Sequence, residues 1–196
     1  NREGLNKRIK TMNAFVASLE EDIPRDLYIS GYRIIFLFND RIVKTGDYVN
    51  DVDTDFEEAF FSGTIDGTPY KDGNGQFGQF LLGATFDEEE DGIIYQINKK
   101  ANSLNMEVTF DDAEIEITQD DPWHVNVTLR SKLLIEDRGG LAKWEKNSVL
   151  STSITIENFV DPLYIKNTRA LVVNKFNQTP YDVPFPLLAN LISHAE

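Results

Sequence analysis

The sequence predicts an α+β fold: a long kinked N-terminal helix packed against an antiparallel β-meander, with two shorter helices. Two observations lead to this class. Apolar residues recur every three or four positions through the first forty-odd residues, which is the period of a helix. From Met106 onward they alternate with polar residues, which is the period of strands with one dry face and one wet face.

Composition narrows the classes of function. The chain has 196 residues, of which 41% are hydrophobic, enough for one good core. The net charge of −14 repels nucleic acid. The absence of Cys excludes disulfides, zinc–thiolate sites and thiol catalysis. No apolar run approaches the roughly 18 residues that span a bilayer.

The N-terminal helix is expected over residues 2–44, and its character changes at Pro24. Pro24 removes a backbone hydrogen bond, so we expect a kink, or a break with Asp22 capping a second helix. Beyond Pro24, apolar residues cover most of the circumference, as in a helix buried on nearly all sides. Before it lies a narrow stripe with the two-per-heptad spacing of a coiled coil. We call this stripe the seam: Leu5, Ile9, Met12, Val16, Leu19 and Ile23.

This change divides the chain into a stalk, residues 1–23, and a single globular domain, residues 24–196. Two interpretations of the seam remain open. It packs against another chain, as a self-association surface, or against its own domain. A stripe two residues wide is typical of helices that bury it against a partner helix.

Two shorter helices follow. Gly46 is expected to end the first helix. The second is predicted over residues 53–61, capped by Asp53 or Thr54. Residues 62–79 are rich in turn signals such as Asp66-Gly67. The third helix is predicted over residues 86–103, with Thr85 and Glu88 forming a capping box.

The meander is predicted from residue 106 to residue 159. Turns are expected at Asp111-Asp112, residues 119–122 and Gly139-Gly140, and the dry face includes Trp123. That face needs a cover, which the broad apolar surface of residues 27–43 provides. Residues 163–176 are expected to add an edge strand, and a Pro-rich tail leads to a short apolar segment at residues 187–192.

Candidate metal sites are weak. Residues 51–55 (DVDTD) resemble the opening of a calcium loop, but Phe56 and Ser62 stand where an EF-hand requires Gly and Glu. We therefore interpret the cluster as a helix cap. The turn at residues 72–76 offers alternating oxygens to Ca²⁺ or is a plain loop. His124 and His194 have no partner at metal-ligand or triad spacing.

Other chemistry is equally sparse. The pairs Asp111/Asp112 and Asp120/Asp121 suggest a two-carboxylate hydrolase, but Asp is also favoured in turns. Two sequons mark Asn126 and Asn177 as candidate glycosylation sites. No catalytic residue and no cofactor is predicted.

Three segments carry a resemblance to a known family: TMNAF at residues 11–15, LYISGYR at 27–33 and FVDPLYIKNT at 159–168. With the kinked helix and the meander, they resemble archaeal type IV pilin-like surface proteins, in an ectodomain without its N-terminal hydrophobic segment. The resemblance implies a non-enzymatic extracellular subunit of a filament or cell surface that serves assembly or adhesion. It also implies a membrane anchor upstream and partners that are copies of the chain or related pilin-like proteins.

The basic residues Arg2, Lys7, Arg8 and Lys10 fit a position next to that membrane. The alternative is an extracytoplasmic ligand-sensing domain of a membrane receptor, and a secreted hydrolase comes third. The sensor's pocket would be lined by residues of the helices and the loop: Tyr28, Tyr32, Arg33, Arg41, Tyr70 and Tyr95.

Overall fold

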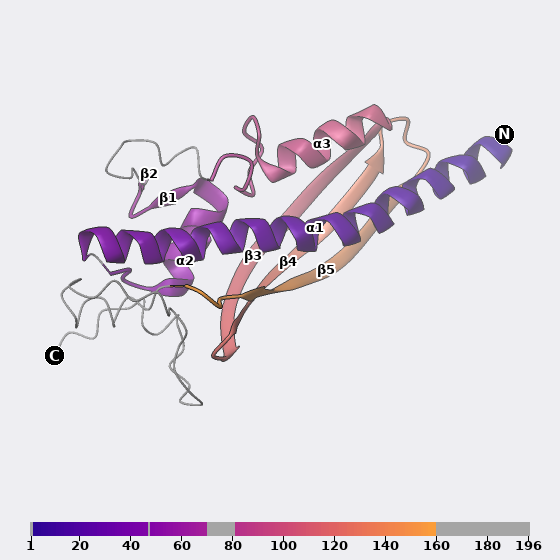
Figure 1. The fold of residues 1–196 in the computed structure, drawn as a ribbon. Coiled ribbons are helices and arrows are strands. Elements are labelled where there is room, and N and C mark those ends of the chain that lie inside the picture. The colour runs from indigo at the N-terminus through magenta and orange to yellow at the C-terminus, as the bar shows by residue number, and fades with distance from the viewer. Residues whose placement is uncertain (1, 47, 70–80, 160–196) are drawn as a thin grey trace.

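A computed structural model describes residues 2–46, 48–69 and 81–159. The chain is α+β, with a long N-terminal helix, two shorter helices and antiparallel sheets, as the sequence predicts (Figure 1). The elements in order are α1 (Arg2–Thr45), α2 (Val52–Ser62), β1 (Thr64–Ile65), β2 (Thr68–Pro69), α3 (Ile93–Ser103), β3 (Met106–Asp121), β4 (His124–Asp137) and β5 (Lys143–Thr155).

The main sheet has the order β3-β4-β5, and both pairs are antiparallel. Every second residue of β4 is buried, while those between are exposed or half-buried, so the predicted dry and wet faces are confirmed. Helix α1 packs against β4 and β5, and α2 and α3 pack against β3. The dry face is buried beneath these helices through Val125, Val127, Leu129, Leu133, Ile135 and Ile154.

Helix α1 continues through Pro24 without a break, and its axis curves toward the N-terminal end (Figure 1). Asp22 therefore caps no second helix. It instead receives ion pairs from Arg25 at 3.0 Å and from Lys100 of α3 at 2.9 Å. The predicted end is confirmed, because Gly46 has a φ of 77° and its N–H bonds to the Ile42 carbonyl at 2.9 Å.

Helix α1 approaches the sheet closely at Gly31. A Cβ atom there would lie 2.6 Å from Cδ1 of Ile154 and 3.0 Å from Cγ2 of Val127. Both of these side chains are fully buried, so they cannot move aside into solvent. The absence of a side chain at Gly31 thus sets the distance between α1 and the β4–β5 part of the sheet.

Helix α2 anchors a row of aromatic side chains. Its N-cap is Asp51, two or three residues before the predicted caps, and the Asp51 carboxylate accepts a hydrogen bond from the Thr54 N–H at 2.8 Å. Phe60 of α2 stacks on Phe86 with ring centroids 5.3 Å apart, and Phe86 meets Phe110 of β3 edge-on at 5.0 Å. These rings join α2, the segment before α3 and the sheet into one core.

The third helix begins later than predicted, at Ile93, and the capping box of Thr85 and Glu88 does not form. Asp91 has a φ of 79°, which ends any helical path through the acidic run. Gly92 then lies so close to Asp87 that a Cβ would be 2.0 Å from Oδ1 of Asp87. The Asp87 carboxylate also accepts the Glu89 N–H at 3.1 Å, a turn that competes with helix.

Strand β3 does not turn at Asp111-Asp112, contrary to the prediction. The strand continues to Asp121 and contains a β-bulge with one extra residue. Asp111 pairs with Lys132 and Glu114 pairs with Arg130, so β3 advances by three residues where β4 advances by two. Asp112, with a φ of 50°, lies at this bulge. Trp123 is likewise not a dry-face strand residue, since it lies half-buried in the β3–β4 turn.

The predicted turns at Asp66-Gly67 and Gly139-Gly140 are confirmed as the β1–β2 and β4–β5 connections. The predicted edge strand at residues 163–176, the apolar segment at 187–192 and the turn at 72–76 lie outside the described residues.

The close approach at Gly31 predicts a steric effect on stability. Gly31→Val should lower the free energy of unfolding by about 1–3 kcal/mol, because a branched side chain overpacks against Ile154 and Val127. Urea denaturation measures this quantity. Gly4→Ala is the control: nothing lies within 4 Å of a Cβ at Gly4, and stability should stay unchanged or rise slightly. Equal effects of the two substitutions would contradict the close approach.

Candidate functional site

The seam of α1 is mostly part of the protein's own core. Met12, Val16, Leu19 and Ile23 are buried and belong to one hydrophobic cluster with the sheet. Of the two interpretations of the seam, packing against the protein's own domain therefore holds for these four residues. The boundary between the exposed and the buried part of the seam therefore lies near Met12 and not at residue 23. The core that covers α1 extends to both sides of Pro24.

The remaining two seam residues, Leu5 and Ile9, are 39% and 41% exposed. They belong to the first turns of α1, and the N-terminal end of this helix extends beyond the sheet (Figure 1). The β4–β5 turn belongs to the same end of the molecule and exposes Leu141, by 61%. We call Leu5 and Ile9 the N-terminal apolar patch. Arg2, Lys7 and Lys10 are exposed beside it.

An ion pair fixes this end of α1 to the sheet. The Arg8 guanidinium donates to the Asp137 carboxylate and, at 2.7 Å, to the Asn105 carbonyl after α3. The side chain of Asp137 is almost fully buried. The hydrogen bond from the Leu141 N–H, and after it Arg8, lower the pKa of Asp137 against the opposing effect of burial. The pair therefore holds together α1, the α3–β3 connection and the β4–β5 turn.

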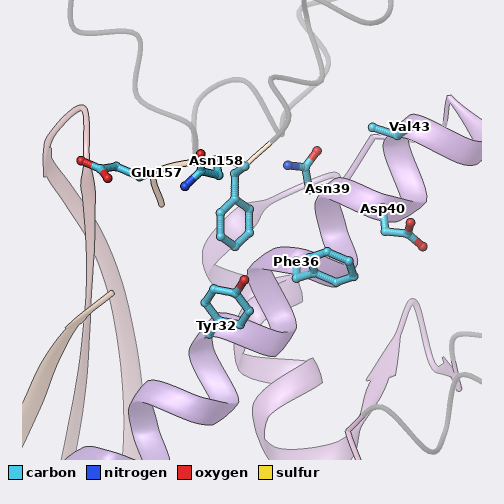
Figure 2. A pocket seen from close by; sticks show the side chains of 8 residues that line it. Tyr32, Phe36, Asn39, Asp40, Val43, Glu157 and Asn158 are labelled. Carbon is cyan, nitrogen blue, oxygen red and sulfur yellow. The ribbon is translucent and has the colours of Figure 1, made fainter. Parts of the chain in front are cut away.

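A second candidate site is a groove of about 260 Å³ on the C-terminal half of α1. We call it the aromatic groove, and Figure 2 shows the residues that line it. The amide side chains of Asn39 and Asn158 lie on one side of it, and the carboxylates of Asp40 and Glu157 lie at opposite ends. The lining residues are Tyr32, Phe36, Asn39, Asp40, Val43, Glu157, Asn158 and Phe159.

The rings of the groove come from two distant parts of the chain. Phe159 meets Tyr32 edge-on with centroids 5.2 Å apart and Phe36 at 6.4 Å. Tyr28 extends the row, stacked on Tyr32 at 6.4 Å. Phe159 is 9% exposed, whereas the three α1 rings are 38–41% exposed. The four-residue spacing of Tyr28, Tyr32 and Phe36 is visible in the sequence. No sequence pattern near Phe159 indicates that its ring contacts them.

Among the described residues, several that were predicted to line a sensor's pocket contact different parts of the chain. Tyr32 lines the aromatic groove with Tyr28 next to it, but Arg33 donates to the Leu82 carbonyl and Arg41 pairs with Asp66 of the β1–β2 turn. Tyr95 lies on α3 beside Lys99, and Tyr70 is outside the described residues. The groove is also smaller than the roughly 300–1,000 Å³ of typical small-molecule sites.

The carboxylates of the candidate pair Asp120/Asp121 accept hydrogen bonds from the backbone and from a neighbouring side chain. Asp121 accepts the Trp123 N–H at 2.7 Å, which lowers its pKa, and also contacts the His124 ring. Asp120 accepts from the Asn126 amide at 3.0 Å. The candidate glycosylation site Asn126 is half-buried on the wet face of β4. Asn177 and His194 lie outside the described residues.

The acidic cluster at residues 51–55 acts as a helix cap, as predicted. Asp51 caps α2, and the buried Asp55 carboxylate accepts the Asn50 N–H at 3.0 Å. Burial raises the pKa of Asp55. Within residues 2–46, 48–69 and 81–159, no group of three or more His, Asp or Glu side chains is arranged to hold a metal ion.

Comparisons with known proteins identify no relative. No protein-family model, no curated protein and no solved structure matches this chain. None of the helices in the described part of the chain is both long and apolar enough to span a membrane.

The burial of the seam predicts a contrast within one helix. Leu19→Ala should lower the free energy of unfolding by about 2–5 kcal/mol, since it leaves a cavity in the core. Leu5→Ala should change it by less than about 0.5 kcal/mol because Leu5 is already half in water. Both values follow from chemical denaturation of the purified chain. Similar losses at the two positions would contradict the placement of Leu19 in the core.

The Arg8–Asp137 pair predicts a pH-dependent contribution to stability. Its carboxylate has a lowered pKa in the folded state, so its stabilisation is present above the unfolded pKa near 3.8 and is lost as the pH falls through the folded value. Asp137→Asn should therefore lower the melting temperature at neutral pH, with the difference from wild type shrinking in acid. Glu107→Gln, on an exposed side chain 3.9 Å from Arg138, is the control and should show little change. A constant difference across this pH range would refute the role of the charge.

Proposed function

We propose that this chain is a non-enzymatic, pilin-like subunit of a cell surface or filament, involved in assembly or adhesion. The observation that carries the proposal is the N-terminal apolar patch: Leu5 and Ile9 continue the buried stripe of α1 but are 39% and 41% exposed. A stripe that is dry along the domain and exposed at its end has the geometry of an interface with another helix. The partners would be copies of this chain or related subunits.

The charge distribution supports the orientation that this function requires. The chain carries a net charge of −14, yet Arg2, Lys7 and Lys10 surround the exposed end of α1. Basic residues next to an anchor favour contact with anionic lipid headgroups. We therefore propose that this end of α1 faces the membrane, anchored by an upstream segment, and that the sheet faces outward on the cell surface.

The competing functions have less support. A ligand-sensing domain would need a pocket, and among the described lining residues Arg33, Arg41 and Tyr95 contact different parts of the chain. A hydrolase would need converging carboxylates, but Asp111 and Asp112 lie at a bulge while Asp120 and Asp121 lie at the β3–β4 turn. No observation favours a turnover reaction over a mechanical role.

Self-association tests the proposal directly. The double substitution Leu5→Glu and Ile9→Glu should weaken self-association by about tenfold or more, since ~1.4 kcal/mol of lost apolar contact suffices for that factor. Sedimentation velocity over a concentration series measures the effect. Val149→Glu is the matched control, because Val149 is 63% exposed on the wet face of β5. A wild-type chain that stays monomeric at high concentration, or a loss equal to that of the control, would count against this interface.

A further inference from the structure

The main sheet has two edges, and their sequences differ. Strand β3 forms one edge, and its sequence, MEVTFDDAEIEITQDD, is strongly acidic. Its register with β4 also shifts twice, between Asp111 and Glu114 and between Thr118 and Asp121. Charged side chains and bulges of this kind keep the edge of a sheet from pairing with another chain. The β3 edge is therefore poorly suited to strand addition.

Strand β5 forms the other edge, which is regular and largely uncharged (Figure 1). Its register with β4 runs without a shift from Lys143, opposite Glu136, to Thr155, opposite His124. Residues 147–155, NSVLSTSIT, contain no charged residue, no Pro and no Gly. Among the described residues, β4 is the one strand that pairs with β5. Because an edge strand directs every second N–H and C=O outward, this stretch presents a regular row of donors and acceptors.

The chemistry of residues 147–155 fits a second copy of the same strand. Two identical strands pair antiparallel about a two-fold axis, so that one surface serves both copies. With this axis at Ser151, the uncharged stretch pairs entirely with itself, and no two like charges face each other. An axis at Val149 would also bring Glu145 and Lys146 into the paired stretch. Since each copy carries a net charge of −14, an uncharged edge is where two copies meet with least repulsion.

The side chains of this stretch leave surface for a second copy to cover. Leu150 and Thr152 lie opposite buried residues of β4 on the dry face, yet both are only half-buried. Val149 on the wet face is 63% exposed. With the two-fold axis at Ser151, Leu150 of each copy lies opposite Thr152 of the other, and Val149 lies opposite Ser153. Directly opposite side chains of this kind stabilise an antiparallel pair of strands.

We propose that β5 is an interface for strand addition, at which residues 147–155 of two copies pair antiparallel about Ser151. The product is a continuous sheet with three strands from each copy, in the order β3-β4-β5-β5-β4-β3. The interface uses neither residue of the N-terminal apolar patch. It therefore goes beyond the proposed function, and the two can be tested apart in a full chain that carries Leu5→Glu and Ile9→Glu.

Opposite charges at Ser151 test both the interface and its register in that background. Ser151 is exposed on the wet face, so Ser151→Lys and Ser151→Glu leave the core intact. Each variant alone should dimerise about tenfold more weakly than its parent, since two like charges face each other across the axis. An equimolar mixture of the two should regain association, because Lys then lies opposite Glu. Sedimentation velocity measures association, and melting temperatures verify folding.

Val149→Lys and Val149→Glu in the same background are the matched controls. Val149 lies on the same face as Ser151 but opposite Ser153, so each control should associate like its parent, alone or in the mixture. A parent chain that stays monomeric would overturn the proposal, and this is the result expected if another segment of the same chain pairs with β5. Ser151 variants that associate as the Val149 variants do would overturn it as well.

A cross-linking measurement in this background checks the register independently, since the chain has no native Cys. Ser151→Cys should form a covalent dimer about tenfold faster than Val149→Cys, because a disulfide needs Cα atoms within about 7 Å and only residue 151 faces its own copy. Non-reducing gels follow the reaction. Equal rates at the two positions would contradict pairing about Ser151. A fast cross-link at Ser151 upholds this interface even where Leu5→Glu and Ile9→Glu leave the association of the wild-type chain unchanged, a result that counts against the proposed function alone.

Discussion

The fold depends on the contact between α1 and one face of a three-stranded sheet. This sheet has a single dry face, and an isolated sheet of this kind is unstable until another element buries that face. Gly31 lets the α1 backbone approach Val127 and Ile154 closely, so that the side chains on either side of the crossing interlock. The Arg8–Asp137 pair and the Lys146–Glu20 pair then fix the helix along its length.

Periodic patterns were predictable because they reflect burial directly. The alternation from Val125 to Ile135 identified the dry face, and Gly46 identified the end of α1. The predictions of element boundaries failed where one local sequence signal is compatible with two different backbone structures. Asp111-Asp112 favours a positive φ, which serves a bulge as well as a turn. The acidic run before Ile93 is suited to a helix N-terminus, but Asp87 used its carboxylate in a turn instead.

The candidate sites were predictable only in part, for a related reason. The seam was recognised from spacing alone, yet spacing cannot distinguish a sheet of the same chain from a second helix as its cover. The residue that decides this, Leu19, is buried by strands more than a hundred positions later. The aromatic groove likewise joins Tyr32 to Phe159, a contact that no local pattern indicates.

The order of the elements along the chain has a consequence for biosynthesis. Helix α1 is made first, but β5, the strand it contacts most extensively, is completed only at Thr155. At ordinary translation rates of about 5–20 residues per second, the apolar side of α1 waits on the order of ten seconds for its sheet. The apolar side of α1 therefore stays without its cover until β5 has been made, so this core is completed late in synthesis.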